Sequence, residues 1–352
     1  MKRILLLCCV LPLLCVAQTG KPLQQKSLHL WNIRPANYSG ITHIAADTFA
    51  LVSDKEKLNG FFLFTIQQNP ETGEILHVTS DSLRGVTPTF VDTAGISLHD
   101  CEDIAYVPES NSLFISAEGD QTILEYDLNG QPTGRGLYIP NEFRHDNIYW
   151  NLGFEALTYD ATSKRFWTTT EATLRSDGEY ARIERPGVQN VLRIQSFNSD
   201  LMPCAQYAYQ MDHHKAKTTG ISHAFGVPAL CALPDGRLLV MERELRISPN
   251  YLSSHVECKI FVVNPKESHQ IDSSTDFKEF DPNQFMLKRL VATFTSKLSP
   301  IAYNIGNYEG MCLGRKLNDG RQTLILISDS QGGAKKHGFR VKDYLKVIVL
   351  ED

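Results

Sequence analysis

Short runs of hydrophobic and β-branched residues alternate with clusters of turn residues along most of the chain. Each run is about four to eight residues long, the usual length of a β strand. Turn dipeptides such as Asn129-Gly130, Asp235-Gly236 and Asp319-Gly320 separate the runs, and such dipeptides favour tight connections between strands. Long amphipathic helical patterns are absent from the sequence. The sequence therefore predicts an all-β fold.

One pattern of strands recurs five times along the chain. In each repeat the second strand ends in an acidic residue, and these residues are Asp54, Glu118, Glu171, Glu242 and Asp329. A supersecondary unit that recurs in this way is typical of a repeat architecture. With about four strands in each repeat, we expect a β-propeller of five four-stranded blades. Six blades are the alternative, if residues 171–228 or 242–309 hold a further repeat.

The two ends of the chain are expected to meet in one blade. The last repeat has room for only three strands before the chain ends, and the run Ser27-Leu28-His29-Leu30-Trp31 precedes the first repeat without a place in it. We expect this N-terminal run to supply the missing outer strand of the last blade. Such closure hides the open edge of a sheet.

The acidic residues should gather at one mouth of the central channel. In three repeats the first strand also begins with an acidic residue (Glu102, Glu155 and Glu309), whereas the other two carry Thr42 and Pro228. The first strand of a blade starts where the second ends, so both sets of carboxylates face the same side. Neighbouring carboxylates raise one another's pKa unless a positive charge lies among them. Three arrangements are possible. The positive charge is a hard cation, with calcium the first candidate, or it is an arginine, with Arg243 the first candidate. In the third arrangement, some of these acids are protonated or face solvent.

The N-terminus predicts export. Lys2 and Arg3 precede an apolar run from Ile4 to Val16, and Cys15-Val16-Ala17 is a small-x-small cleavage pattern, which together indicate a signal peptide over residues 1–17. We expect a secreted or periplasmic monomer consisting of one domain over residues 18–352, with no transmembrane segment.

Charge and cysteine content narrow the class of protein further. The mature chain has 33 basic and 40 acidic residues, a net charge of 33 − 40 = −7, which argues against a nucleic-acid partner. Five cysteines remain after cleavage. We interpret Cys231 and Cys312, which lie in strand-like runs, as buried free thiols.

Familiar catalytic motifs are missing. The string nearest to a Gly-x-Ser-x-Gly elbow, Gly95-Ile96-Ser97-Leu98-His99, has histidine in the last position. No His-Glu-x-x-His motif and no phosphate-binding glycine loop occurs. We interpret His213-His214 as part of a surface loop. Three asparagines are turn formers or, alternatively, ligands through their carbonyl oxygens: Asn151, Asn304 and Asn307.

Several stretches resemble the phytase-like domain family, also described by an esterase-like activity of phytase. The matching stretches are Gly40-Ile41, Asp100-Cys101-Glu102-Asp103-Ile104-Ala105, Asn151-Leu152-Gly153-Phe154-Glu155-Ala156-Leu157, Thr170-Glu171-Ala172-Thr173-Leu174, Leu239-Val240-Met241-Glu242-Arg243, Asn307-Tyr308-Glu309-Gly310-Met311 and the run from Asp319 to Asp329. The resemblance implies an exported β-propeller and hydrolysis of phosphate or carboxylic esters. The chain departs from the family pattern at Asp103, where glycine is usual, and after Asp329, where an Asp-Asn pair is usual.

These observations lead to a hypothesis of a metal-dependent esterase or phosphoesterase that acts on a small anionic ester. Calcium would be held by a ring of carboxylates, namely Glu102, Glu242, Glu309 and Asp329. Glu155 or Glu171 would accept a proton from water. The substrate anion would be bound by Arg243, Arg182 and Arg175, with His43 as a further channel-facing candidate. Two alternatives stay open: a non-catalytic propeller that binds a ligand or protein at the cell envelope, and a lactonase-like hydrolase.

Overall fold

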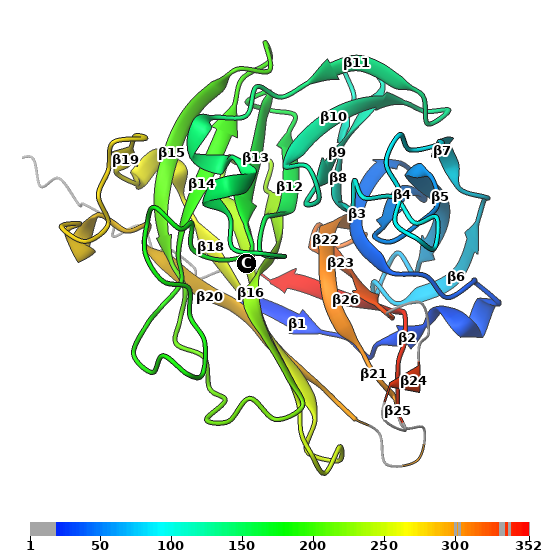
Figure 1. The fold of residues 1–352 in the computed structure, drawn as a ribbon. Helices are drawn as coiled ribbons and strands as arrows, with labels where there is room; N and C mark the ends of the chain where they lie inside the picture. The colour runs from blue at the N-terminus through cyan, green and yellow to red at the C-terminus, as the bar shows by residue number, and fades with distance from the viewer. Residues whose placement is uncertain (1–18, 299–300, 302–303, 331–334, 337–338, 352) are drawn as a thin grey trace, which may run out of the picture.

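Five antiparallel sheets form a closed ring in the computed structural model, which describes residues 19–298, 301, 304–330, 335–336 and 339–351. The ring is a five-bladed β-propeller (Figure 1). The first strand of each blade contacts the first strands of both neighbouring blades, so the five first strands surround the axis. The predicted fold and the count of five blades are confirmed.

Each blade is a sheet of antiparallel strands. Blade 1 consists of β3 (Tyr38–Ala45), β4 (Thr48–Ser53), β5 (Asn59–Gln68) and β6 (Ile75–Ser80), with β7 (Arg84–Val86) against β5. Blade 2 consists of β8 (Cys101–Val107), β9 (Ser112–Ala117), β10 (Thr122–Asp127) and β11 (Pro132–Gly136). Blade 3 consists of β12 (Phe154–Asp160), β13 (Arg165–Thr170), β14 (Val191–Phe197), β15 (Pro203–Gln210) and the short β19 (Gln270–Ile271). Blade 4 consists of β16 (Ser222–Ala232), β17 (Leu238–Ile247), β18 (His255–Val263) and β20 (Lys288–Lys297). Blade 5 consists of β22 (Asn307–Lys316), β23 (Gln322–Asp329), β26 (Tyr344–Glu351) and β1 (Thr19–Pro22).

The N-terminus closes the last blade, but with a different segment from the one predicted. The strand β1 pairs with β26, as Figure 1 shows, and Thr19 lies opposite Glu351. Of the predicted closing run, only Ser27 joins this blade, through the short strand β2 (Lys26–Ser27) that also pairs with β26, and the rest forms the 3₁₀ helix η1 (Leu28–Trp31). Ser27 caps this helix by accepting a hydrogen bond from the backbone N–H of His29, and the Leu28 side chain is buried. Burial of Leu28 and the serine cap explain why this hydrophobic run turns instead of extending.

The hydrophobic core lies between the blades rather than within one of them. Each of the five buried clusters joins two neighbouring sheets. Leu51 and Phe64 of blade 1, for example, share a cluster with Ile325 and Leu345 of blade 5. Both faces of a blade are therefore apolar, which explains the near-continuous hydrophobic runs of the second strands.

Residues 171–228 and 242–309 were the two segments in which a sixth blade was possible. Their described residues hold no further blade. They contain β14, β15 and the extended strands β16 to β20, together with the single-turn helices η4 (Pro265–Glu267) and η5 (Pro282–Gln284). A small sheet of β21 (Asn304–Ile305), β25 (Phe339–Val341) and β24 (Lys335–Lys336) lies outside the ring.

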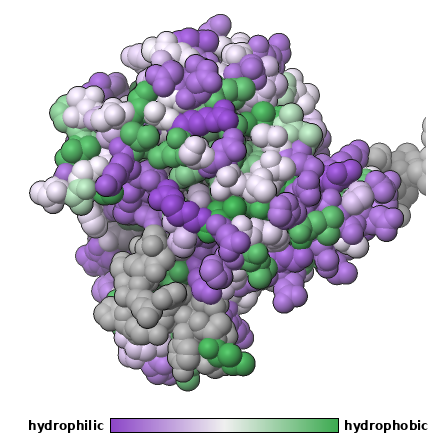
Figure 2. Space-filling model, turned by 90° about the vertical axis from the view of Figure 1, so that its right-hand side faces the viewer, coloured by the Kyte–Doolittle hydropathy of each residue, from purple (hydrophilic) through white to green (hydrophobic). Residues whose placement is uncertain are grey.

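The predicted signal peptide, residues 1–17, lies outside the described residues. Among those described, no helix is long and apolar enough to cross a membrane. On the face drawn in Figure 2, hydrophilic residues predominate, and hydrophobic residues form separate patches between them.

Candidate functional site

A cavity of about 820 Å³ opens at the mouth of the central channel. Among the described residues, seven carboxylates line it: Asp54, Glu102, Glu155, Glu171, Glu184, Glu309 and Asp329. Only three permanently charged cations of the described chain share its wall: Lys55, Arg182 and Arg243. The cavity is therefore strongly negative, as the repeat pattern predicted.

β-Bulges at the start of the first strands place the acidic side chains. The pairing of first and second strands shifts register at Glu102-Asp103 in blade 2, at Glu155 in blade 3 and at Glu309 in blade 5. An extra residue in one strand re-aims its side chain, and bulges often lie beside functional sites. The corresponding bulge residue in blade 1 is Ser39, so the position assigned to Thr42 from the sequence was wrong.

Five acidic residues form a compact carboxylate cluster on one side of the mouth. Oxygen atoms of Glu102, Glu118 and Glu155 lie within 4.8 Å of one another, and so do those of Asp54, Asp100 and Glu102. Asp100 was missed as a ligand from the sequence, although it directly precedes Cys101-Glu102 and has a left-handed backbone with φ of 56°. We call these five residues the carboxylate cluster.

The cluster has unsatisfied oxygen atoms. Oδ1 of Asp54 and Oδ1 of Asp100 are buried and have no hydrogen-bond partner. The other oxygen of Asp54 pairs with Lys55, and Glu118 accepts a hydrogen bond of 2.6 Å from the backbone N–H of Gly153. Buried polar atoms normally have partners, so orphaned oxygens within a group of clustered carboxylates indicate a place for a cation.

Burial and mutual repulsion disfavour the charged forms of these acids. Burial, followed by repulsion from Glu155, raises the pKa of Glu102 well above its usual range. Burial raises the pKa of Asp54 to about 7, with Asp329 adding to the effect. Burial also raises the pKa of Glu118 to about 7, although its bond from Gly153 opposes the change. The carboxylate cluster therefore requires protons or a bound cation near neutral pH.

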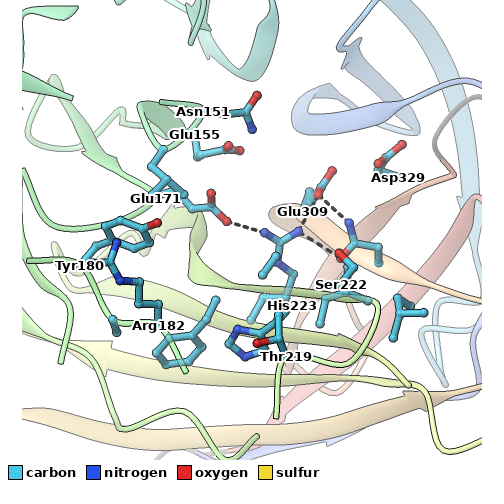
Figure 3. A pocket seen from close by; sticks show the side chains of 18 of the residues that line it. Asn151, Glu155, Glu171, Tyr180, Arg182, Thr219, Ser222, His223, Glu309 and Asp329 are labelled. Atoms are coloured by element: carbon cyan, nitrogen blue, oxygen red, sulfur yellow. Dashed lines mark hydrogen bonds and ion pairs between the residues drawn. The ribbon is translucent and has the colours of Figure 1, made fainter. Parts of the chain in front are cut away.

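Arg243 neutralises two further acids of the mouth. Its guanidinium lies 2.5 Å from Glu171 and 2.6 Å from Glu309, and it donates a third bond of 3.0 Å to Oδ1 of Asn307. Figure 3 shows Glu171 and Glu309 converging from different blades on this cation, with Glu155 on the side of Glu171 and Asp329 on the side of Glu309. Of the three arrangements left open by the sequence, arginine pairing thus accounts for part of the ring.

Glu242 does not line the cavity, contrary to the predicted metal ligand set. It accepts hydrogen bonds from the Tyr209 hydroxyl at 2.7 Å and from Nζ of Lys288 at 2.7 Å, on the face of β17 that turns toward blade 3. In the other blades the second strand ends beside the acidic residue, whereas β17 continues to Ile247. Side chains alternate along a strand, so Arg243 points to the cavity and Glu242 points away.

Two predicted substrate-binding residues lie outside the cavity. Nε2 of His43 is 2.8 Å from the carbonyl oxygen of Ala46, and its ring packs on Phe49. This position is at the far end of β3 from the mouth. Arg175 stacks on Tyr149 and donates to the carbonyl of Ile148.

Other predicted residues occupy the cavity wall or the core. Arg182 lines the cavity, with its guanidinium 5.1 Å from the Tyr180 ring centroid, and Asn151 lines it as well. The Asn304 side chain lies outside the described residues. Cys231 and Cys312 are buried free thiols, as predicted.

Asp103, one of the departures from the family pattern, serves the fold. Its carboxylate accepts hydrogen bonds of 2.8 Å from the backbone N–H groups of Ile104 and Leu157, and the bond from Leu157 ties blade 2 to blade 3. The side chain is 1% exposed. The departure at this position therefore leaves the carboxylate cluster unaltered.

The chain belongs to the phytase-like family described by an esterase-like activity of phytase, which it matches over residues 34–331. No curated protein matches the chain.

Three solved structures resemble the chain distantly. A putative oxidoreductase (glucose dehydrogenase) from Thermus thermophilus is 10% identical, with a TM-score of 0.42 over 93% of this chain and 99% of that one. A DUF4221 family member from Bacteroides vulgatus is 9% identical, with a TM-score of 0.40 over 95% and 96% of the two chains. The tail fibre of a Staphylococcus aureus phage is 11% identical, with a TM-score of 0.40 over 94% of this chain but 52% of the fibre. At these TM-scores the likenesses carry no argument about this protein.

Proposed function

We propose that this protein is an exported, calcium-dependent hydrolase of small anionic phosphate or carboxylic esters. The observation that carries the proposal is the pair of orphaned oxygens, Oδ1 of Asp54 and Oδ1 of Asp100, in a cluster of buried acids on the wall of a large open cavity. Membership of the phytase-like family supports ester hydrolysis as the reaction class.

The carboxylate cluster fits a hard cation. Calcium takes six to eight oxygen ligands at about 2.3–2.6 Å in flexible geometry, and the cluster offers five carboxylates in two overlapping groups that share Glu102. Asp54, Asp100, Glu102 and Glu118 would hold the ion, and Glu155 beside them would be left free to act as the base. Of the other predicted ligands, Glu309 is engaged by Arg243, and Asp329 lies close enough to Asp54 to raise its pKa.

A bound calcium ion would polarise the phosphoryl or acyl oxygen of the ester and offset the charge of the cluster. With that charge offset, Glu155 is ionised and can accept the proton of the attacking water as the ester bond breaks. Arg243 orients Glu171 through their ion pair and so fixes the adjoining wall. Arg182 is the cavity-lining arginine free of a carboxylate ion pair among the described contacts, and it suits the anionic group of the substrate.

A substrate panel with and without a chelator tests the proposal. Purified protein is assayed on phosphomonoester, phosphodiester, carboxylester and lactone substrates, first with calcium and then with excess EGTA. We expect turnover of at least one anionic ester that is lost with EGTA and restored by calcium. Calcium-independent turnover would contradict the proposed mechanism, and failure of the whole panel would favour a non-catalytic propeller.

Substitution of Glu155 separates catalysis from folding. Glu155→Gln should lower kcat by about 10²–10⁴-fold, the usual contribution of a general base, while the thermal transition stays cooperative. Glu125→Gln is the matched control, since Glu125 is also buried but bonds to Ser112 outside the cavity. Equal activity of both variants would exclude Glu155 as the base.

Export and a monomeric state belong to the same proposal. Expression of the full chain, followed by cell fractionation and mass spectrometry of the mature N-terminus, should find cleavage after residue 17. A cytoplasmic chain with an intact leader would contradict export, and sizing of the mature chain tests the monomer.

A further inference from the structure

The segment 211–221 packs on one face of the long hairpin formed by β16 and β17. Alternate residues of β17 hold it: the Glu244 carboxylate accepts hydrogen bonds of 2.8 Å from the backbone N–H groups of Lys215 and Ala216. Arg246 donates to the Thr218 hydroxyl at 2.7 Å. The segment also borders the main cavity, because Thr219 and Ile221 contribute to its wall.

Two histidines and a glutamate meet where this segment crosses the hairpin. Ligand atoms of His214, His223 and Glu244 all lie within 4.8 Å of one another. Nε2 of His223 is 3.1 Å from Oε1 of Glu244, and both side chains are deeply buried, with exposed fractions of 6% and 8%. Donor atoms around a tetrahedral zinc at about 2.0–2.1 Å lie roughly 3.3 Å apart, close to the 3.1 Å between His223 and Glu244.

The orientation of His214 leaves one ring nitrogen available. Nδ1 of His214 is 2.9 Å from the carbonyl oxygen of Ala216. A carbonyl only accepts, so Nδ1 donates this hydrogen bond, and Nε2 is the ring nitrogen left for a metal. A metal-bound histidine usually donates its other N–H in this way, which fixes the tautomer and the ring plane. The ring centroids of His214 and His223 lie 5.7 Å apart in an edge-to-face arrangement, so the rings are not stacked on each other.

Glu244 retains the capacity to bind a metal. Its two backbone hydrogen bonds use one lone pair on each oxygen, and a carboxylate has about four acceptor sites. These bonds hold the carboxylate in place on the buried face, while Phe225 packs against both histidines and limits access of water. The site thus has ordered ligands, supporting hydrogen bonds and an apolar wall.

We propose that His214, His223 and Glu244 bind a zinc ion that fastens segment 211–221 to the β16–β17 hairpin. Two imidazoles and one carboxylate favour zinc over calcium, which takes oxygen ligands. The fourth position would be filled by water. His223 lines the main cavity, so zinc fixes part of the wall on which the substrate is expected to lie, and it is a separate ion from the one in the carboxylate cluster.

Zinc binding to the full mature chain tests this site directly. Protein stripped with a chelator is titrated with zinc chloride by calorimetry, and cobalt(II) is titrated in parallel because four-coordinate cobalt absorbs strongly in the visible range. We expect one zinc per chain at this site, and a cobalt spectrum typical of four-coordinate N/O ligation. His214→Gln and His223→Gln should each weaken zinc binding at least about tenfold.

His213→Gln is the matched control, because His213 is the exposed neighbour of His214 in the same segment. It should bind zinc as the unaltered protein does, and circular dichroism confirms that all variants are folded. If His214→Gln and His223→Gln retained full zinc affinity, or if the unaltered protein bound no zinc, the proposal would be wrong and the contact would be a His223–Glu244 ion pair only. Glu102→Gln should leave zinc binding intact, so failure of the calcium site and failure of the zinc site are distinguishable.

Discussion

At the scale of single residues, the acids of the channel mouth form two groups, of which one is paired with Arg243 and the other is not. Arg243 donates hydrogen bonds to Glu171, Glu309 and Asn307. In the carboxylate cluster, Asp54 pairs with Lys55. The negative charge of the other cluster members is offset by backbone donors, by protons or by a bound cation. An arginine paired in this way contributes order to the site.

Replacement of Arg243 should destabilise the fold. Arg243→Met leaves two buried carboxylates without a counter-charge, and removal of one partner of a buried ion pair costs about 3–5 kcal/mol. Urea unfolding monitored by fluorescence measures the loss, with Arg182→Met at the cavity rim as the control. Glu171→Gln combined with Arg243→Met should recover part of the loss in a double-mutant cycle; simple additivity of the two changes would argue against the pair.

The raised pKa values predict an unusual pH dependence of stability without metal. Burial raises the pKa values of Asp54 and Glu118 from 3.8 and 4.5 to about 7. At pH values between the unfolded and the native pKa values, the native state binds more protons than the unfolded state. The contribution of these two carboxyls to the free energy of unfolding is therefore largest at low pH and falls as pH rises toward 7.

Urea midpoints in EGTA at pH 5 and pH 7.5 measure this effect. The double variant Asp54→Asn, Glu118→Gln should lose less stability over the interval than the unaltered protein, and saturating calcium should reduce the loss in the unaltered protein. Identical pH profiles for the two proteins in EGTA would show that these carboxyls titrate normally.

At the scale of elements, β-bulges and strand length decide which residues reach the cavity. The bulges at Glu102-Asp103, Glu155 and Glu309 turn acidic side chains into the mouth. In blade 4 the bulge lies between Gly226 and Ala229. A Cβ atom at Gly226 would be 2.3 Å from Cγ of Glu171 and 2.7 Å from its carbonyl oxygen, so glycine is required for the close approach of β16 to Glu171.

Removal of strand β1 should open the ring. A chain that starts at Leu23 lacks the four residues that pair with β26, and the exposed edge of β26 becomes available to other chains. We expect the melting temperature to fall by several degrees and soluble oligomers to form, measured by calorimetry and light scattering. Lys21→Glu, which changes only an exposed side chain of β1, should behave like the unaltered protein; an unchanged monomer after truncation would show that β1 is dispensable.

At the scale of the whole molecule, five blades bring together charges that lie far apart in the sequence. Asp54 belongs to the first repeat and Asp329 to the last. Burial is the main cause of the raised pKa of Asp54, and repulsion from Asp329 is the next. The closed ring prevents these charges from moving apart without breaking contacts between first strands. A ligand that binds the folded mouth and not the unfolded chain therefore stabilises the entire propeller.

Calcium should raise the thermal stability of the protein. At a free calcium concentration of 100 times Kd the linkage relation gives about 2.7 kcal/mol, and differential scanning calorimetry over a calcium series measures the shift. Asp54→Asn and Glu102→Gln should abolish most of the shift, whereas Glu125→Gln should retain it. A calcium shift that survives in both cluster variants would place the ion elsewhere.

The sequence predicted more of the fold than of the site. Strand runs and the recurrent acids indicated the five blades, and in four blades the acid at the second strand lies at the cavity or in the carboxylate cluster. Glu242 was misplaced because the repeat pattern shows where an acid falls but not whether the strand continues past it. Asp100, Ser39 and His223 were not identified, since bulges and chain crossings depend on contacts between distant segments.

Local physical chemistry therefore determined the strands, the turns and the gathering of negative charge at one end of a propeller. Each of these follows from the order of apolar, turn and acidic residues, because strand alternation and repeat spacing are properties of the chain itself. The tertiary structure alone decided which acids pair with Arg243, which are left for a metal, and which histidines meet across segment 211–221. Pairing depends on distances of a few ångströms between blades, and only the closed ring sets those distances.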